Sequence, residues 1–473
     1  MNNVIAVAYI VAFSLFIYGL MGLTGPRTAV RGNWIAATGM AIAVIATLVL
    51  IRHTTNWPLI VAGLLVGVVL GVPPARLTKM TAMPQLVALF NGVGGGTVAL
   101  IALAEFIDTD GFSTFHHGES PTAHIVVASL FAAIIGSISF WGSLIAFGKL
   151  QEILPGRPIG IRKAQQPLNI LLLLAAIASA VVIGIAAHPG GGAPLWWMIG
   201  LLAAAGVLGL MVVLPIGGAD MPVVISLLNA MTGLSAAAAG LALNNTAMIV
   251  AGMIVGASGS ILTNLMAKAM NRSIPAIVAG GFGGGGVAVS GGDDGDRTVK
   301  PTSAADAAIQ MAYANQVIVV PGYGLAVAQA QHAVKDMATM LENKGVPVKY
   351  AIHPVAGRMP GHMNVLLAEA DVEYDAMKEM DDINDEFGRT DVAIVIGAND
   401  VTNPAARNEP NSPIYGMPIL NVDKARSVIV LKRSMNSGFA GIDNPLFYGE
   451  GTTMLFGDAK KSVSEVTEEL KAL

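Results

Sequence analysis

Long apolar runs constrain this chain more than any other feature of its sequence. A bilayer core about 30 Å thick is crossed by about 20 apolar residues in an α-helix. Stretches of roughly that length fill the first 270 residues: 3–23, 33–51, 57–72, 83–107, 122–147, 167–187, 193–216, 221–243 and 246–266. We therefore predict that residues 1–270 form a polytopic α-helical membrane domain of about nine transmembrane helices in a lipid bilayer.

The composition supports this division of the chain and excludes several kinds of protein. Only 12% of the 473 residues are charged, 54% are hydrophobic and the mean hydropathy is +0.64; charges reach an ordinary density only after about residue 290. The net charge of −4 and the lack of a Lys/Arg cluster argue against a nucleic-acid partner. The sequence contains no cysteine, which excludes disulfides, thiolate metal sites and cysteine nucleophiles. We predict no metal site.

Lysine and arginine are unevenly distributed among the loops, and this predicts the orientation. The loops after the odd-numbered spans hold 10 of these residues, whereas those after the even-numbered spans hold only Arg52. Because basic loops stay in the cytoplasm, we expect the N-terminus outside and the C-terminal region in the cytoplasm. The first apolar stretch follows Met1-Asn2-Asn3 without a basic segment or a clear cleavage site, so we expect a retained helix.

Polar residues inside apolar helices are costly and therefore informative. Asn91 and Asn229 each lie about eight residues from the cytoplasmic end of their span, roughly 12 Å deep, so they could meet across a helix interface. Asp220 stands at the cytoplasmic mouth of the eighth span. The pattern fits interhelical hydrogen bonds and a helix cap, and it equally fits a proton or ion path.

The C-terminal part of the chain has the pattern of a soluble α/β domain. Residues 271–303 are rich in glycine and are predicted to form a linker. Residues 304–473 alternate helical segments with apolar strand candidates at 317–320, 346–352, 392–396 and 427–431. This alternation predicts a Rossmann-like, doubly wound parallel sheet.

A glycine turn follows the first of these strands. The turn contains a variant of the dinucleotide fingerprint, with Gly322, Gly324 and, in place of the third glycine, Val327. A helical pattern continues from it to about Lys344. We expect the glycines to allow close approach of the backbone to a pyrophosphate at the helix N-terminus; a plain strand-to-helix turn is the alternative. Lys432 and Arg433 directly follow the strand candidate at 427–431. Such cations favour the 2′-phosphate of NADP over NAD, although two basic residues after a strand are also common without a ligand.

Several longer motifs resemble one known family, the beta subunits of proton-translocating nicotinamide nucleotide transhydrogenases. In the C-terminal part they are 320–331, 353–369, 397–400, 432–435 and 457–460, and in the membrane part 217–224 and 268–273. The resemblance implies hydride transfer from NADH to NADP⁺ coupled to proton translocation into the cytoplasm across the inner (cytoplasmic) membrane. It also implies that this chain binds NADP(H), that a partner alpha subunit binds NAD(H), and that the complete complex is a dimer. The protein mainly positions the cofactors, since the hydride passes between them.

The same resemblance assigns roles to residues. It identifies Asp400 as the residue that couples NADP(H) binding to protonation. The residues that it implies for cofactor binding are Gly322, Tyr323, Gly324, Ala326, Val327, Val355, Ala356, Gly357, Arg358, Met359, Pro360, Gly361, Gly397, Ala398, Asn399, Asp400, Val401, Gly416, Met417, Lys432, Arg433, Ser434, Phe439, Asp458 and Ala459. For the proton path, the polar positions of the spans and the resemblance together point to Asn91, Asp220, Asn229 and Arg272.

Two positions depart from the family pattern. Asn91 stands where well-studied relatives carry a channel histidine, and a histidine from a partner chain could stand in beside it. Phe439 stands where relatives often carry tyrosine, so one hydroxyl contact is lost. A competing hypothesis is a channel or secondary transporter gated by a nucleotide-sensing domain, which would need no NAD(H)-binding partner and would not reduce its ligand.

Overall fold

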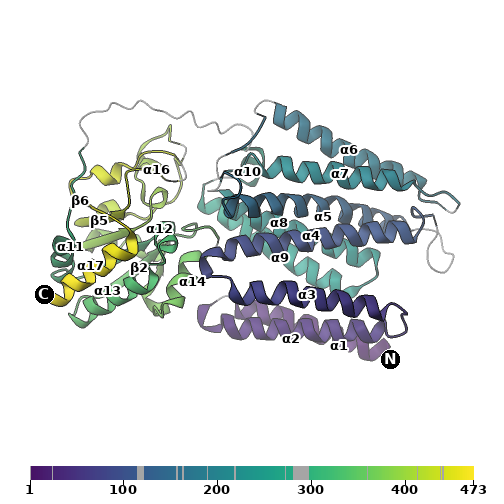
Figure 1. The fold of residues 1–473 in the computed structure, drawn as a ribbon, viewed down its shortest axis with the longest axis horizontal. Helices are drawn as coiled ribbons and strands as arrows, with labels where there is room; N and C mark the ends of the chain where they lie inside the picture. Colours follow the sequence, from purple (N-terminus) through teal and green to yellow (C-terminus); the bar gives the residue numbers. More distant parts are fainter. Residues whose placement is uncertain are drawn as a thin grey trace. The chain divides into compact units, whose positions relative to one another are not determined.

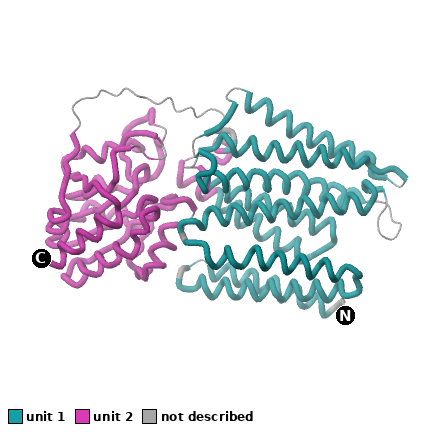
Figure 2. The backbone as a smooth tube through the Cα atoms, in the orientation of Figure 1, with its two compact units in different colours: residues 1–217, 223–263, 278–282 teal, residues 218–222, 264–277, 283–473 magenta. Residues whose placement is uncertain are grey.

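The computed structural model describes residues 2–473 except 24, 114–121, 156–157, 162–163, 189, 218–219, 272, 281–297, 360, 413, 437 and 439–440. The chain divides into two compact units (Figure 2). The membrane unit comprises residues 1–217, 223–263 and 278–282, and the sheet unit comprises residues 218–222, 264–277 and 283–473. The predicted limits at 270 and 303 stay a prediction.

Long helices fill the first part of the chain (Figure 1). They are α1 (Asn2–Gly22), α2 (Pro26–Leu50), α3 (Trp57–Leu77), α4 (Met83–Asp108), α5 (Ala123–Leu150), α6 (Gln165–Ala186), α7 (Leu195–Val213), α8 (Met221–Ala242) and α9 (Thr246–Ala269). Within the described residues, nine helices are long and apolar enough to cross a membrane, as predicted. Two helix boundaries differ most from the predicted spans. Helix α2 begins seven residues earlier than predicted, with a proline in its first turn, and α3 continues past Pro73 and Pro74.

Small residues let these helices approach closely. A Cβ on Gly95 of α4 would lie 2.9 Å from the carbonyl oxygen of Gly136 on α5. A Cβ on Gly233 of α8 would lie 2.6 Å from the backbone nitrogen of Gly256 on α9. These glycines therefore serve backbone-to-backbone packing, the expected cohesive contact where lipid provides little hydrophobic drive.

The second part of the chain contains a six-stranded parallel sheet in the order β3-β2-β1-β4-β5-β6. The strands are β1 (Val317–Pro321), β2 (Val348–Ile352), β3 (Met377–Glu379), β4 (Val392–Ile396), β5 (Ser427–Lys432) and β6 (Thr452–Phe456). The four predicted strands are confirmed. Strands β3 and β6 lie at the two edges of the sheet, and their mixed residues gave no apolar run that would predict them.

Helices and short turns precede, connect and follow these strands. The α-helices are α10 (Ile274–Gly280), α11 (Ala304–Ala312), α12 (Tyr323–Val327), α13 (Gln331–Asn343), α14 (His362–Glu369), α15 (Met380–Ile383), α16 (Ala405–Asn408) and α17 (Ala459–Ala472). Helices α13 and α17 lie side by side (Figure 1), and α11 also packs against α17. On one face of the sheet, Val320, Val395 and Val430 join a buried cluster that includes Phe387 and Phe447. With both faces covered, the sheet has the layers of a Rossmann-like domain.

The helical pattern after β1 is interrupted, contrary to the expectation of one helix reaching Lys344. Helix α12 ends at Val327, and Gln329 adopts a left-handed conformation with φ of 50°. The N–H of Gln329 donates to Ala326 O and that of Ala330 to Leu325 O. These bonds form a Schellman cap, which satisfies the last carbonyls of α12 before α13 begins.

The predicted linker contains ordered segments. Residues Ile274–Gly280 form α10, and Pro301 pairs with Met454 of β6 in parallel register. Ser303 then caps α11, its hydroxyl accepting the N–H of Asp306 at 3.1 Å. Residues 281–297, the most glycine-rich part of the expected linker, lie outside the described residues.

Candidate nucleotide site and membrane polar cluster

The turn after β1 meets the turn after β4 where the strand order reverses, the usual ligand-binding crevice of an open α/β sheet. A Cβ on Gly322 would collide with the backbone of Ala398, and one on Gly324 would lie 2.7 Å from the Cα of Gly397. The N–H of Gly324 also donates to Gly397 O at 3.0 Å. The glycines thus bring two loops together backbone against backbone, a use that the sequence analysis did not foresee.

The loop after β2 carries a cation beside this turn. Arg358 places its guanidinium carbon 4.3 Å from the ring centroid of Tyr323, the first residue of α12. The backbone N–H of Arg358 donates to Nδ1 of His362 at 3.0 Å. Gly357 has a φ of 107° and Gly361 a φ of 67°, so both glycines hold turns that other residues rarely adopt. The described part of the loop therefore presents Arg358 beside Tyr323.

His353 holds the beginning of the same loop. Its Nδ1 accepts the N–H of Val355 at 3.2 Å, and its Nε2 lies 2.8 Å from Pro418 O. The imidazole is therefore neutral, with its proton on Nε2, which donates to Pro418 O. Burial lowers the pKa of His353 to about 4, against the weaker raising effect of Pro418 O. Met417, beside this proline, is buried in a small cluster with Ala406.

The loop after β4 approaches the loop after β5. A Cβ on Gly438 would lie 2.7 Å from both Asp400 Oδ1 and Asn399 Nδ2. The amide of Asn444 donates to Asn399 O at 3.1 Å and to its Oδ1 at 3.0 Å. The Asp400 carboxylate is therefore held next to the segment that follows Lys432.

The two cations after β5 are placed differently. Lys432 is half-buried: its Nζ donates to Asn436 O at 2.6 Å and lies 4.5 Å from the ring centroid of Phe447. Burial lowers the pKa of Lys432, while the charges of Asp443 and Asp400 raise it. Arg433 is exposed and makes no ion pair within the described part of the chain. Arg433 is thus the more available of the two for a phosphate, and Lys432 also shapes its own loop.

The remaining predicted positions lie along the same edge of the sheet or outside the described residues. Asp458 follows β6 and caps α17 by accepting the N–H groups of Lys460 and Lys461. Because all the strands are parallel, the loops after β1, β2, β4, β5 and β6 share one edge. Val327 ends α12 and is 46% exposed, so it does not serve the close helix packing of a third fingerprint glycine. Pro360 and Phe439 lie outside the described residues.

Asn91 lies in a buried polar cluster of the membrane unit. Its Nδ2 donates to Ser143 Oγ of α5 at 2.9 Å and more weakly to Ser139 Oγ at 3.4 Å. The hydroxyl of Ser139 also bonds that of Thr232 on α8. Asn91 Oδ1 is buried without a hydrogen-bond partner among the described residues. The cluster therefore links α4, α5 and α8 and retains one unused acceptor.

The expected meeting of Asn91 with Asn229 does not take the form of a hydrogen bond. Asn229 is half-buried on α8, and within the described residues Thr232 is the α8 side chain that joins the cluster around Asn91. Ser226, one turn earlier on α8, instead bonds Thr263 of α9 at 3.1 Å. Sequence patterns did not single out Ser139 and Ser143. The four-residue spacing of the two serines on one span was the available signal, since it places both on one helix face.

Asp220 and Arg272 are the other two positions assigned to the proton path. Asp220 directly precedes α8 and is half-buried. Arg272 lies outside the described residues.

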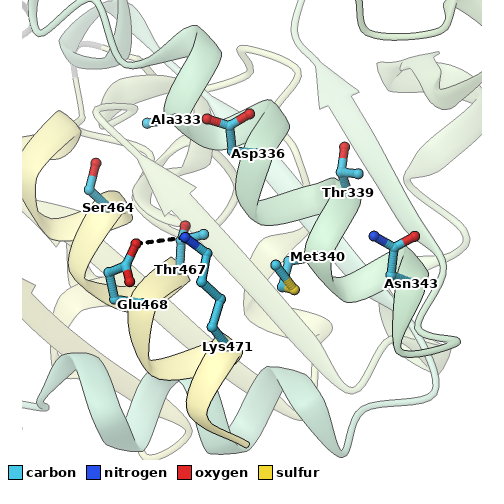
Figure 3. A pocket seen from close by; sticks show the side chains of 9 residues that line it. All are labelled: Ala333, Asp336, Thr339, Met340, Asn343, Ser464, Thr467, Glu468 and Lys471. Atoms are coloured by element: carbon cyan, nitrogen blue, oxygen red, sulfur yellow. Dashed lines mark hydrogen bonds and ion pairs between the residues drawn. The ribbon is translucent and has the colours of Figure 1, made fainter.

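A pocket of about 380 Å³ lies apart from the predicted site residues (Figure 3). Side chains of α13 and α17 line it, among them Asp336, Glu468 and Lys471, and the last two form an ion pair at 2.7 Å. None of its lining residues belongs to the loops at the carboxyl edge. The pocket therefore has no part in the proposed nucleotide site.

Taken together, apolar helices and a parallel sheet with a glycine-lined switch point define a membrane protein with a dinucleotide-type α/β domain. Comparison with known proteins identifies the family. The model of the NAD(P) transhydrogenase beta subunit matches residues 5–469. The NAD(P) transhydrogenase subunit beta of Rhodospirillum rubrum is 48% identical over 464 residues, 98% of each chain, and the same subunit of strain ATCC 11170 matches equally well. The chain belongs to the NAD(P) transhydrogenase beta subunits, a family of membrane-bound enzyme subunits that use nicotinamide nucleotides.

Proposed function

We propose that this chain binds NADP(H) at the carboxyl edge of its sheet and couples hydride transfer from NADH to the entry of protons into the cytoplasm. One observation carries the nucleotide part of the proposal. The switch point between β1 and β4 is lined by the backbone of Gly322 and Gly324, with the guanidinium of Arg358 beside it. A switch point of this kind with a nearby cation suits the pyrophosphate of a dinucleotide.

The proposed nucleotide specificity rests on the loop after β5. The exposed guanidinium of Arg433 is available for a 2′-phosphate, which it can contact through two parallel hydrogen bonds. Lys432 adds a second positive charge and holds the loop through Asn436. When bound, the nucleotide supplies the hydride acceptor, so the side chains named here position it. They favour NADP(H) over NAD(H) because only NADP(H) offers a 2′-phosphate to pair with them.

The proposed division of labour follows from the family. We propose that an alpha subunit supplies the NAD(H) site, since the described residues contain one dinucleotide-type sheet and the reaction needs two nucleotides. The complete complex is proposed to be a dimer in the cytoplasmic (inner) membrane. The excess of basic residues in one set of loops supports an external N-terminus and a cytoplasmic sheet domain.

The proposed coupling uses Asp400 and the polar cluster of the membrane unit. Burial lowers the pKa of Lys432, and the charge of Asp400 partly offsets this, so Asp400 interacts electrostatically with a cation that is expected to face the nucleotide phosphate. Asn91, Asp220, Asn229 and Arg272 are proposed to lie along the proton path. Asn91 does not titrate, and its Oδ1 has no hydrogen-bond partner among the described residues. We propose that this oxygen accepts a hydrogen bond from water or from a partner's protonatable side chain.

Hydride transfer tests the nucleotide part. Membranes containing this chain and its alpha partner are expected to reduce a thio-analogue of NADP⁺ with NADH, whereas the purified chain alone should not. By calorimetry the full chain should prefer NADP(H), and Lys432→Ala with Arg433→Ala should weaken its binding by about 2–5 kcal/mol. Equal affinity for NAD(H) and NADP(H) would refute the nucleotide assignment. A nucleotide-gated channel would bind the ligand and change flux without reducing it.

Reconstituted vesicles with a pH-sensitive dye test the proton path. Asn229→Leu should abolish proton movement and leave NADP(H) binding nearly unchanged. Asn91→His should retain more activity than Asn91→Leu, because the site already accommodates a polar side chain bonded to Ser143. If both asparagines only support packing, both leucine variants will pump normally once folded.

A further inference from the structure

His362 has an unusual relation to the loop that carries Arg358. The imidazole is 1% exposed, and its Nδ1 accepts the N–H of Arg358 at 3.0 Å. A Cβ on Gly357 would lie 2.5 Å from the same nitrogen, and Gly357 has a φ of 107°. The ring therefore fills the inner side of the turn, and the turn can close around it only because residue 357 lacks a side chain.

The hydrogen bond fixes the protonation state of the ring. Because Nδ1 accepts, the proton of the neutral imidazole is on Nε2. Nε2 is buried and has no hydrogen-bond partner among the described residues. A buried, unsatisfied N–H costs free energy, so folding stability alone does not explain a histidine at this position. The role of Nδ1 as a hydrogen-bond acceptor for the loop does explain the histidine.

Arg358 has a defined contact at its backbone and another at its guanidinium. Its guanidinium lies 4.3 Å from the Tyr323 ring centroid, and the rings of Tyr323 and His362 are 6.4 Å apart. One end of Arg358 is thus held at its backbone by His362, and the other end lies over the residue that follows the Gly322 turn. Stacking of a cation on an aromatic face is directional, so a change in the backbone at Arg358 would move the charge away from the crevice.

We propose that His362 is a positioning residue for the nucleotide site. Its neutral imidazole holds the backbone of Arg358 so that the guanidinium stays over Tyr323 and faces the dinucleotide phosphates. His362 acts through Arg358 and does not touch the nucleotide, since its Nε2 is buried. The inference rests on the proposed binding of NADP(H) at this edge of the sheet.

The test uses the full chain with its alpha partner in membranes and the thio-NADP⁺ assay. His362→Leu removes the acceptor, whereas His362→Asn keeps one, because the asparagine Oδ1 lies at a similar distance from Cα as Nδ1. We expect His362→Leu to raise the KM for the NADP⁺ analogue about tenfold, the effect of one lost favourable contact, with little change in kcat. His362→Asn should restore most of the affinity. His332, an exposed histidine on α13, provides the control, and His332→Leu should behave as the wild type.

A double-variant cycle separates positioning from general damage to the fold. If His362 acts through Arg358, His362→Leu should add little to the defect of Arg358→Ala. Full additivity, an asparagine variant as impaired as the leucine variant, or an unchanged KM in His362→Leu would each overturn the inference. If the wild type itself shows no preference for NADP(H) over NAD(H), the proposed function fails, and this inference fails with it.

Discussion

The two units of this chain bury their interiors in different ways. In the membrane unit, helix backbones approach closely at glycines, as where Gly252 of α9 meets Gly233 and Ala237 of α8. In the sheet unit, the centre consists of aliphatic side chains such as Ile394 and Val430, which are fully buried. The difference follows from the solvent. Apolar side chains gain little by leaving lipid, so the membrane helices depend on close packing and interhelical hydrogen bonds, whereas the sheet unit depends on the removal of apolar surface from water.

Low pH is expected to produce the largest difference in stability between the two units. His353 and His362 are buried in the sheet unit, and burial lowers the pKa of each to about 4 from an ordinary 6.5. Between these values the unfolded chain binds protons that the folded unit does not. The free energy of unfolding therefore falls as the pH drops from about 6.5 to about 4, by roughly 3 kcal/mol for each histidine. The described histidines of the membrane unit, His53, His124 and His188, are exposed.

This prediction can be measured on the intact chain in detergent. All five tryptophans precede residue 198, so their fluorescence reports on the membrane unit. Proteolysis within 304–473 reports on the sheet unit. We expect the latter to lose protection between pH 7 and pH 4.5 while the tryptophan signal stays constant. Equal protection at both pH values would contradict the proposed burial of neutral imidazoles.

A matched pair of isoleucines tests the role of the solvent. Ile394 of β4 and Ile183 of α6 are both 0% exposed. Ile394→Ala should destabilise the sheet unit by about 2–5 kcal/mol, because it loses both the transfer free energy from water and the packing around the side chain. Ile183→Ala should cost clearly less, since unfolding within a membrane exposes the residue to lipid. Urea unfolding of the sheet unit and thermal unfolding followed by tryptophan fluorescence give the two values; similar losses would undermine the comparison.

The sequence predicted the two units well where the solvent imposes a simple pattern. Nine apolar stretches became helices, and the Val- and Ile-rich runs became β1, β2, β4 and β5. The pattern failed where neighbours decide the structure. β3, with the sequence Met-Lys-Glu, is a strand because it pairs with β2, and α12 ends at a Schellman cap that contains no glycine.

The candidate site was predicted in part. Strand ends and motifs located the loops at the carboxyl edge, but they did not show how the loops hold one another. Gly322 packs on Ala398, and Asn91 bonds a serine 52 residues away. Contacts between residues so far apart in sequence depend on strand order and helix packing, which local patterns do not contain.

The next largest loss of stability is expected from a substitution where α8 packs closely on α9. A Cβ at Gly252 would collide with the backbone of Ala237 and lie 2.6 Å from Gly233 O. Backbone atoms cannot rotate away as a flexible side chain can, so Gly252→Ala should force the helices apart. We expect a loss of about 1–3 kcal/mol and a lower midpoint of thermal unfolding by tryptophan fluorescence. A variant as stable as the wild type would show that α8 and α9 lie further apart than the structure indicates.

The smallest effect is expected for the same substitution on α3. Gly63, Gly67 and Gly71 are spaced four residues apart, yet a Cβ on any of them would meet nothing within 4 Å, and α3 has no buried residue. Gly67→Ala and Gly252→Ala change helix propensity alike, by up to about 1 kcal/mol in favour of alanine, so the difference between their unfolding midpoints isolates the packing contribution. For the chain without its partner, we expect Gly67→Ala to leave the midpoint unchanged or to raise it slightly. A loss as large as that of Gly252→Ala would mean that α3 packs closely on another helix of this chain, and that glycine spacing alone, without its neighbours, is sufficient to predict close helix contact.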